Sequence, residues 1–250
     1  MVSFMFKNYV TSSLRNILRH KYYSLLNILC LSLGLASFIL ISLWVLHEYS
    51  YDRFHENVEN IYSICQEFEY YYQGKNKSPI SPGPLAKAMI NDFPEVISAT
   101  RLTDDNDVLL VVDNESYLED NFYFADPQTF EIFTFPFLKG NPETALDDPY
   151  SMVISEKIAR KYFGDINPIG KIISYRGKND FTVTGVIEDI PSNSTIIMDI
   201  IIPFETYGII VYDALDKWFM SSFYTYVLIN DEVDPYQLNS KFPALIEKMT

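Results

Sequence analysis

Residues 25–46 form an apolar run of twenty-two residues, LLNILCLSLGLASFILISLWVL, without a charged side chain. At a helical rise of about 1.5 Å per residue, such a run spans roughly 33 Å, enough to cross a bilayer core about 30 Å thick. Soluble domains rarely bury so long an uninterrupted apolar helix. The run therefore predicts a transmembrane helix at residues 25–46, and the rest of the sequence is interpreted around it.

The charges on the two sides of this segment are unequal. No acidic residue precedes it, and the basic residues that do are Lys7, Arg15, Arg19 and Lys21. These four carry +4 and the whole chain −14, so the part from Glu48 onward carries −18. The positive-inside rule therefore predicts a cytoplasmic N-terminus, with residues 47–250 on the periplasmic or extracellular side of the membrane.

A cleaved signal peptide is the competing interpretation of the apolar run. Signal peptides have an apolar core of about 7–15 residues followed by a cleavage site made of small residues. The core here is longer, and the segment Trp44–His47 offers no such site. An uncleaved signal-anchor helix is therefore favoured.

The segment before the span has helical periodicity. A basic and polar stripe runs beside apolar side chains at helical spacing, namely Phe6, Val10, Leu14, Ile17 and Leu18. This pattern predicts a cytoplasmic basic amphipathic helix at residues 1–24, lying in the inner-leaflet interface of the lipid bilayer, with a bare topology signal as the alternative.

Composition limits what residues 47–250 can do. With 16% aromatic residues and nine glycines in the chain, a packed domain is favoured over a disordered one. The charge of −18 argues against nucleic acid as a partner, because phosphate contacts need clustered Lys and Arg; a mechanical role or a cationic ligand stays open. Cys30 lies in the span and Cys65 beyond it, so the two cannot form an intramolecular disulfide. An extracytoplasmic domain of this size without a disulfide favours a bacterial protein, and the membrane is then expected to be the bacterial inner membrane.

Apolar patterns divide residues 47–250 into three parts and predict an α+β fold. Residues 61–68, 85–93 and 96–102 form an expected β-α-β unit. Residues 108–189 are expected to be a β-rich insertion with short helices, including a hairpin around Gly177.

Capping signals in these parts predict where helices begin and break. The predicted helix starts are Asp126, Ser155 and Asp234. A final strand at 223–229 precedes the last of these helices, and Pro243 predicts a kink or break inside it.

No motif in the chain predicts an enzyme, a cofactor site or a metal site. His20 is expected on the cytoplasmic side, and His47 and His55 at the outer membrane interface, too few ligands for zinc. Gly164–Lys171 has five residues between its glycines where a phosphate-binding loop needs four, which favours a structural turn. Asp104–Asp107 lacks the central glycine of a calcium loop, which favours a solvated acidic loop.

Two segments resemble MacB/FtsX-like ABC-transporter permeases. The first is the opening FKNYVTSSLRNILRHKYYSLLNILCLSLGLASFILISLWVLHEYSYDRFHENVENIYSI. The second is MVISEKIARKYFGDINPIGKIISYRGKNDFTVTGVIEDIP, with the helix pattern A-R-x-x-F-G, then P-I-G-K, then a V-x-G-V strand in the family's order. The resemblance covers essentially the whole chain.

The resemblance implies a transmembrane helix followed by a MacB-like periplasmic core domain: a porter-like α+β part with an inserted β-rich subdomain. It also implies a non-catalytic permease subunit, working as a homodimer or paired permease with a separate or fused cytoplasmic ABC ATPase. Such permeases move the periplasmic domain as ATP is hydrolysed and expel antimicrobials, peptides or lipoproteins.

The sequence departs from this family in one respect. Family permeases carry at least three further transmembrane helices after the core domain, and these 250 residues contain none. We therefore expect either part of a longer permease or a truncated product. The alternative function is a single-pass, membrane-anchored periplasmic sensor or adaptor without transport activity.

A transmission junction between the span and the domain is the candidate functional site. It consists of Leu46, His47, Glu48, Tyr49, Tyr51, Asp52, Arg53 and Phe54. These residues join the two parts of the chain, and the alternative is that they serve only as a connection.

Overall fold

The computed structural model describes residues 2–70, 74–210 and 215–249. It divides into two compact units, residues 1–51 and residues 52–250, which are described in turn.

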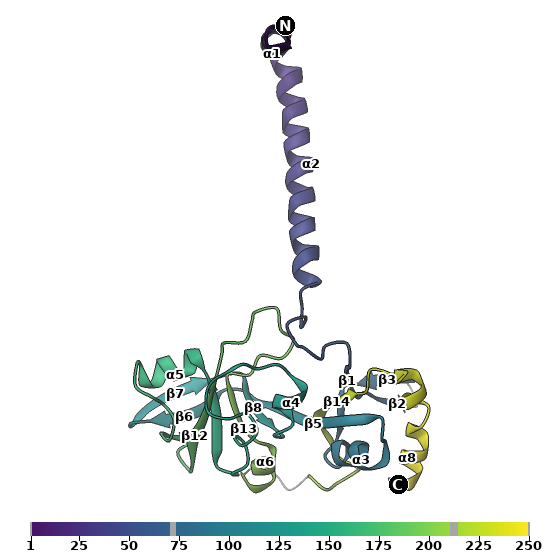
Figure 1. The fold of residues 1–250 in the computed structure, drawn as a ribbon, viewed down its shortest axis with the longest axis vertical. Coiled ribbons are helices and arrows are strands. Elements are labelled where there is room, and N and C mark those ends of the chain that lie inside the picture. The colour runs from purple at the N-terminus through teal and green to yellow at the C-terminus, as the bar shows by residue number, and fades with distance from the viewer. Residues whose placement is uncertain (1, 71–73, 211–214, 250) are drawn as a thin grey trace. The chain divides into compact units, whose positions relative to one another are not determined.

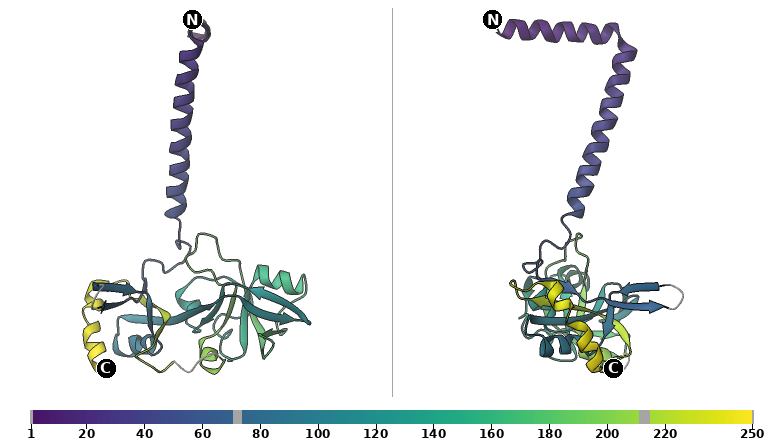
Figure 2. Two further views of the ribbon diagram at one scale, coloured as in Figure 1. Left: turned by 180° about the vertical axis from the view of Figure 1, so that it is seen from behind. Right: turned by 90° about the vertical axis from the view of Figure 1, so that its right-hand side faces the viewer.

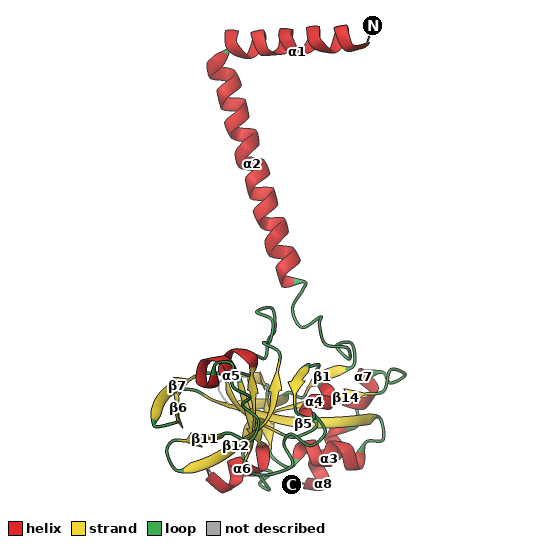
Figure 3. Ribbon diagram, turned by 60° about the vertical axis from the view of Figure 1, so that its left-hand side comes forward, coloured by secondary structure: helices red, strands yellow, loops and turns green. Residues whose placement is uncertain are grey.

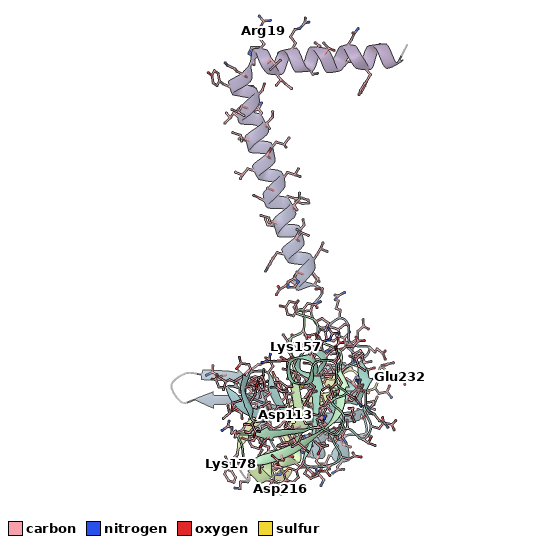
Figure 4. The ribbon with its side chains drawn as sticks, turned by 90° about the vertical axis from the view of Figure 1, so that its left-hand side faces the viewer. Arg19, Asp113, Lys157, Lys178, Asp216 and Glu232 are labelled. Carbon is pink, nitrogen blue, oxygen red and sulfur yellow. The ribbon has the colours of Figure 1, made fainter. Side chains whose placement is uncertain are left out.

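The first unit is two helices, α1 (Val2–Arg19) and α2 (Lys21–Glu48), and the chain bends between them at His20 (Figure 3). Figure 4 shows the side chains of α2 pointing outward all around the helix, and Arg19 at the end of α1. No residue of α2 is buried, and α2 is the one described helix that is long and apolar enough to cross a membrane. In α1, Phe6, Ile17 and Leu18 are exposed, whereas the side chains of Val10 and Leu14 lie outside the described residues.

The second unit is a mixed α+β domain built on a twelve-stranded sheet (Figure 1). In space the main path of the sheet runs β1-β14-β5-β8-β13-β10-β12-β11-β6-β7, with β4 on β14 and β9 on β12. The pairs β10–β12 and β8–β13 are parallel and the other pairs are antiparallel. The strands of this sheet are β1 (Ile61–Ser63), β4 (Ile80–Pro82), β5 (Val96–Asp105), β6 (Val108–Val112), β7 (Glu115–Glu119), β8 (Phe122–Ala125), β9 (Phe137–Lys139), β10 (Ser151–Ser155), β11 (Ile172–Tyr175), β12 (Asn179–Ile187), β13 (Ile200–Pro203) and β14 (Ser221–Ile229).

Strands β2 (Gln66–Tyr70) and β3 (Gly74–Ser78) form a separate two-stranded sheet that projects from the domain (Figure 2). The single strand predicted over residues 61–68 is therefore wrong. Its first residues pair with β14 and its last ones with β3, so the alternating pattern there belongs to two different sheets.

The described residues of the domain also form six short helices: α3 (Leu85–Asp92), α4 (Thr129–Ile132), α5 (Glu156–Phe163), α6 (Phe204–Ile210), α7 (Pro235–Asn239) and α8 (Phe242–Met249). Asp234 caps α7 as predicted, its carboxylate accepting a hydrogen bond from the backbone N–H of Tyr236 at 2.9 Å. The predicted break near Pro243 is confirmed, because α7 ends at Asn239 and α8 begins at Phe242.

Two lobes lie side by side in this domain (Figure 1). The first lobe contains β1, β4, β14, α3, α7 and α8, and its core lies between α3 and the sheet, where Met89 and Val227 are buried. The second lobe contains β6 to β13, α5 and α6, and its core is rich in aromatic rings such as Phe122, Phe181 and Phe204. Strands β6 to β12 fall in the predicted β-rich range 108–189, but β13, at residues 200–203, lies between β8 and β10 in the same sheet. The subdomain boundary therefore stays a prediction.

Strand β5 belongs to both lobes. Residues 96–102 pair with β14 and residues 102–105 pair with β8, so one ten-residue strand crosses from the first lobe to the second. Arg101 lies at this crossing. Its guanidinium donates from Nε to Asp126 Oδ2 and from an η nitrogen to Asp126 Oδ1, both at 2.8 Å.

The same guanidinium also contacts both lobes. It donates to the carbonyl oxygen of Gly83, just before α3, at 3.0 Å, and lies 4.2 Å from the ring centroid of Phe204 in α6. The prediction that Asp126 caps a helix is wrong: its side chain binds Arg101, and α4 begins at Thr129 after Gln128. The crossing thus carries a partly buried, bidentate ion pair in addition to its strand pairing.

Replacing Arg101 with Met is expected to lower the free energy of unfolding by about 2–4 kcal/mol, because it leaves the Asp126 carboxylate desolvated without its partner. The control is Arg176→Met, which removes the more exposed pair with Asp105 and is expected to cost about 0–1 kcal/mol. Urea unfolding of the chain in detergent micelles, followed by near-UV circular dichroism, measures both. Equal losses in the two variants would contradict a special role for Arg101.

Candidate functional site

The predicted transmission junction divides between the two units at residues 51 and 52. In the first unit, Leu46, His47 and Glu48 are the last residues of α2. Tyr49 follows as its C-cap, donating its N–H to the carbonyl oxygen of Val45 at 2.9 Å. The Tyr51 and His47 rings meet edge to face with centroids 5.4 Å apart. These contacts end the helix in an ordered turn.

In the second unit, Asp52 anchors the start of the domain to the loop at residues 193–195. Its N–H donates to the carbonyl oxygen of Asn193 at 3.0 Å. Its carboxylate accepts from the Thr195 N–H at 2.7 Å, from the Ser194 hydroxyl at 3.2 Å and from the Thr195 hydroxyl. Asp52 has a φ of 56°, a conformation that Asp and Asn tolerate better than most residues. One side chain thus binds a loop more than 140 positions further along the chain.

His55 makes a second anchor, to the segment after α4. Its imidazole is buried, with 5% exposed, and its Nδ1 accepts the N–H of Thr134 at 3.1 Å. The N–H of Glu56 donates to the Thr134 hydroxyl at 2.8 Å. The ring centroids of Phe54, Phe133 and Phe135 lie 4.1, 5.2 and 5.7 Å from that of His55. The expectation that His55 is a membrane-interface residue is therefore wrong, because its ring packs inside the domain.

Burial lowers the pKa of the His55 imidazole, and the nearby Asp52 carboxylate opposes this shift only in part. Because Nδ1 accepts a hydrogen bond, the ring is neutral in the folded domain, with its proton on Nε2. Protonation would break the Thr134 hydrogen bond and place a charge among three phenylalanine rings.

The structure brings together part of the predicted junction and adds residues that the sequence did not reveal. Asp52 and Phe54 take part in the anchors, and a cavity of about 250 Å³ lies beside them, lined in part by Asp52, His55 and Thr195. His55, Thr134 and residues 193–195 were missed, because their contacts join distant segments. In the sequence, the one local feature that marks these anchors is the run Asp52–His55, shortly after the end of the span.

The other segments considered for chemistry have structural roles. Gly164 is the C-cap of α5 with a φ of 59°, and the segment after it leads to β11, consistent with a turn. The solvated acidic loop expected at Asp104–Asp107 is wrong in part, because Asp104 and Asp105 are the last residues of β5. Asp105 accepts hydrogen bonds from the Tyr175 hydroxyl and from Arg176, each at 2.8 Å. Among the described residues, no group of three His, Cys, Asp or Glu side chains is placed to hold a metal ion.

Among the described residues, one helix is long and apolar enough to cross a membrane, and a two-lobed mixed α+β domain follows it. The family described as MacB-like periplasmic core domain matches residues 24–245, and the chain belongs to this family. It therefore carries the periplasmic domain found in inner-membrane permeases of ABC transporters, which work with ABC ATPases and are generally not catalytic themselves.

Solved structures share the fold. A domain of a protein from Porphyromonas gingivalis assigned as a permease is 24% identical, with a TM-score of 0.69, over 78% of this chain and 84% of that one. The periplasmic region of MacB from Actinobacillus actinomycetemcomitans is 19% identical, with a TM-score of 0.54, over 77% of this chain and 87% of that one. Comparison with curated protein sequences gives no match.

The His55 anchor predicts a pH dependence of stability. The unfolded imidazole binds a proton near its ordinary pKa of about 6.5, whereas the folded site resists protonation. The stabilisation is therefore complete above pH 7 and is lost as the pH falls through about 6.5 toward the lower folded pKa.

Replacing His55 with Asn keeps an acceptor for the Thr134 N–H but removes the titrating ring. We expect the wild type to lose more unfolding free energy between pH 7.5 and 5.5 than this variant does, measured by urea unfolding at each pH. His47→Asn, outside the domain, is the matched control and should follow the wild type. A variant His55→Asn with the pH dependence of the wild type would contradict the assignment.

Proposed function

We propose that this chain is the N-terminal part of a MacB/FtsX-type permease, whose periplasmic domain moves as a separate cytoplasmic ABC ATPase hydrolyses ATP. The transported cargo would be antimicrobials, peptides or lipoproteins. Family membership and the apolar helix α2 support this proposal. The permease would act as a homodimer or with a paired permease, and the chain would have no catalytic role.

The double anchor at residues 52–56 is the observation that carries the mechanical part of this proposal. Asp52 is bonded to the 193–195 loop, and three residues later His55 is bonded to Thr134. A displacement of residue 52 would therefore be passed to two distant segments, because only three positions separate the two anchors. In this proposal Leu46–Phe54 form the transmission junction, with the end of α2 as the input and the two anchors as the output.

The proposed topology places residues 1–24 in the cytoplasmic leaflet interface, residues 25–46 across the bilayer and residues 47–250 in the periplasm. The basic residues of α1 support it, because cations near a span favour the cytoplasmic side. The bend at His20 agrees with a helix that leaves the direction of the span (Figure 3).

Cysteine labelling tests this topology. The native Cys65 is exposed, so in spheroplasts it should react with a membrane-impermeant charged maleimide. In a Cys30→Ala, Cys65→Ala background, a Ser13→Cys variant should react only after the membrane is permeabilised. Labelling of Ser13→Cys in intact spheroplasts, together with no labelling of Cys65 in the wild type, would reverse the proposed orientation.

Hydrogen–deuterium exchange tests the coupling without knowledge of the cargo. The permease, reconstituted with its cognate ATPase, is compared in the nucleotide-free state and after trapping with ADP and vanadate. We expect trapping to change amide exchange in residues 133–135 and 191–196 of the wild type by at least about twofold. The same change should be absent in Asp52→Ala, which lacks the carboxylate that binds the 193–195 loop.

Two comparisons make this result interpretable. Asp165→Ala, in the exposed turn after α5, is the matched control and should respond as the wild type does. An equal response in Asp52→Ala would overturn transmission through Asp52. No response to trapping in any variant would overturn ATP-driven movement and favour the sensor or adaptor alternative.

A further inference from the structure

A cleft of about 240 Å³ lies over strands β14, β5 and β8, and three of its seven lining residues are tyrosines. Its lining residues are Leu102, Asp104, Tyr123, Thr195, Ile196, Tyr224 and Tyr226. Neither the family match nor the structural comparisons assign a role to it.

Strand register explains why the three tyrosines meet. Tyr224 and Tyr226 are two positions apart in β14 and therefore share one face of the sheet. Leu102 in β5 is paired with Tyr224, and two residues further along β5, Asp104 is paired with Tyr123 in β8. The rings consequently flank a strip of β5 that ends in a carboxylate.

The electrostatics of the cleft favour positive charge. Burial raises the pKa of Tyr123 to about 12, the Asp104 carboxylate adding to the shift, and burial also raises the pKa of Tyr226. The phenols are therefore neutral at physiological pH, and their ring faces carry the negative part of the aromatic quadrupole. Asp104 is exposed and accepts a hydrogen bond from the Asn106 side chain at 3.1 Å. In the described part of the chain, no Lys or Arg forms an ion pair with it.

We propose that this cleft binds the ammonium group of a small organic cation, held among Tyr123, Tyr224 and Tyr226 with Asp104 as its counter-charge. Aromatic walls beside a carboxylate are the usual protein solution for ammonium recognition. The charge of −18 on residues 48–250 raises the local concentration of cations and disfavours anions.

The adjoining cavity gives the ligand room beyond its charged group. This second space, of about 250 Å³, shares Thr195, Ile196 and Tyr226 with the cleft and is lined further by Val58, Ile61 and Phe133. An apolar substituent on the ammonium group would therefore extend toward His55 and Phe133. The preferred ligand is a cation with an apolar tail rather than a metal ion, which would need several converging carboxylates.

The probe is choline, which tests the ammonium subsite alone, with 3,3-dimethylbutan-1-ol as its uncharged isostere. Both are titrated into the full chain in dodecyl maltoside micelles and followed by saturation-transfer NMR and calorimetry. We expect saturable choline binding with a Kd of about 1 mM, as suits one ammonium group in an open aromatic site. The uncharged isostere should bind at least about tenfold more weakly, and binding as tight as that of choline would overturn the proposal.

Four variants locate the binding. Asp104→Asn should weaken choline binding by about fivefold, the range of a partly solvated charge pair. Tyr123→Leu should weaken it likewise, whereas Tyr123→Phe, which keeps the ring, should bind as the wild type does. Asp107→Asn removes the same net charge three positions further along the chain, in the turn after β5, without lining the cleft, and is the matched control.

The outcomes of these titrations are decisive. Unchanged binding in Asp104→Asn, an equal loss in Asp107→Asn, or no saturable choline binding to the wild type would each overturn the assignment. Near-UV circular dichroism confirms that the Tyr123 variants remain folded, and Asp104→Asn, at an exposed position, provides the test that does not depend on repacking.

Discussion

The ion pair between Arg101 and Asp126 is the contact on which the two-lobed domain depends. Strand β5 leaves its partner β14 and joins β8 close to this pair, and the Arg101 guanidinium also contacts Gly83 before α3 and Phe204 in α6. Partly buried charges are costly to separate, because each would lose its partner without regaining full hydration. Separating the two lobes at β5 would therefore break this pair, which favours a domain in which the two lobes move together.

The two anchors near residue 52 lead into the same body. The 193–195 loop bonded to Asp52 continues into Ile196 and Met198, which are buried beside Leu102, and then into β13 in the middle of the sheet. The other anchor, Thr134, lies next to Phe133, which packs against Tyr226 of β14 at a centroid distance of 5.2 Å. One anchor thus leads to β13 in the second lobe, and the other leads to β14 in the first lobe, which pairs with β5.

The parts of the fold that the sequence predicted depend on near neighbours, and the parts it missed depend on distant ones. The cap at Asp234, the break near Pro243 and the turn at Gly177 follow from the chemistry of two to five consecutive residues. Asp126 has the sequence context of a helix cap, but Arg101, twenty-five positions away, provides a stronger partner for its carboxylate. His55 likewise has the context of an interface residue, and only tertiary packing buries it. The prediction of a single strand at residues 61–68 is wrong for the same reason, because an alternating pattern does not specify which strand is the pairing partner.

The cleft and the Asp52 anchor share a structural element, and this has a thermodynamic consequence. Thr195 donates to the Asp52 carboxylate and also lines the cleft, while Tyr226 lines the cleft and packs on Phe133 beside His55. A ligand that prefers one arrangement of residues 193–196 changes the equilibrium of the anchor by its difference in affinity for the two arrangements. By linkage, a load that displaces the anchor must change the affinity for that ligand by the same factor. In the proposed mechanism, occupancy of the cleft and movement of the junction therefore depend on each other.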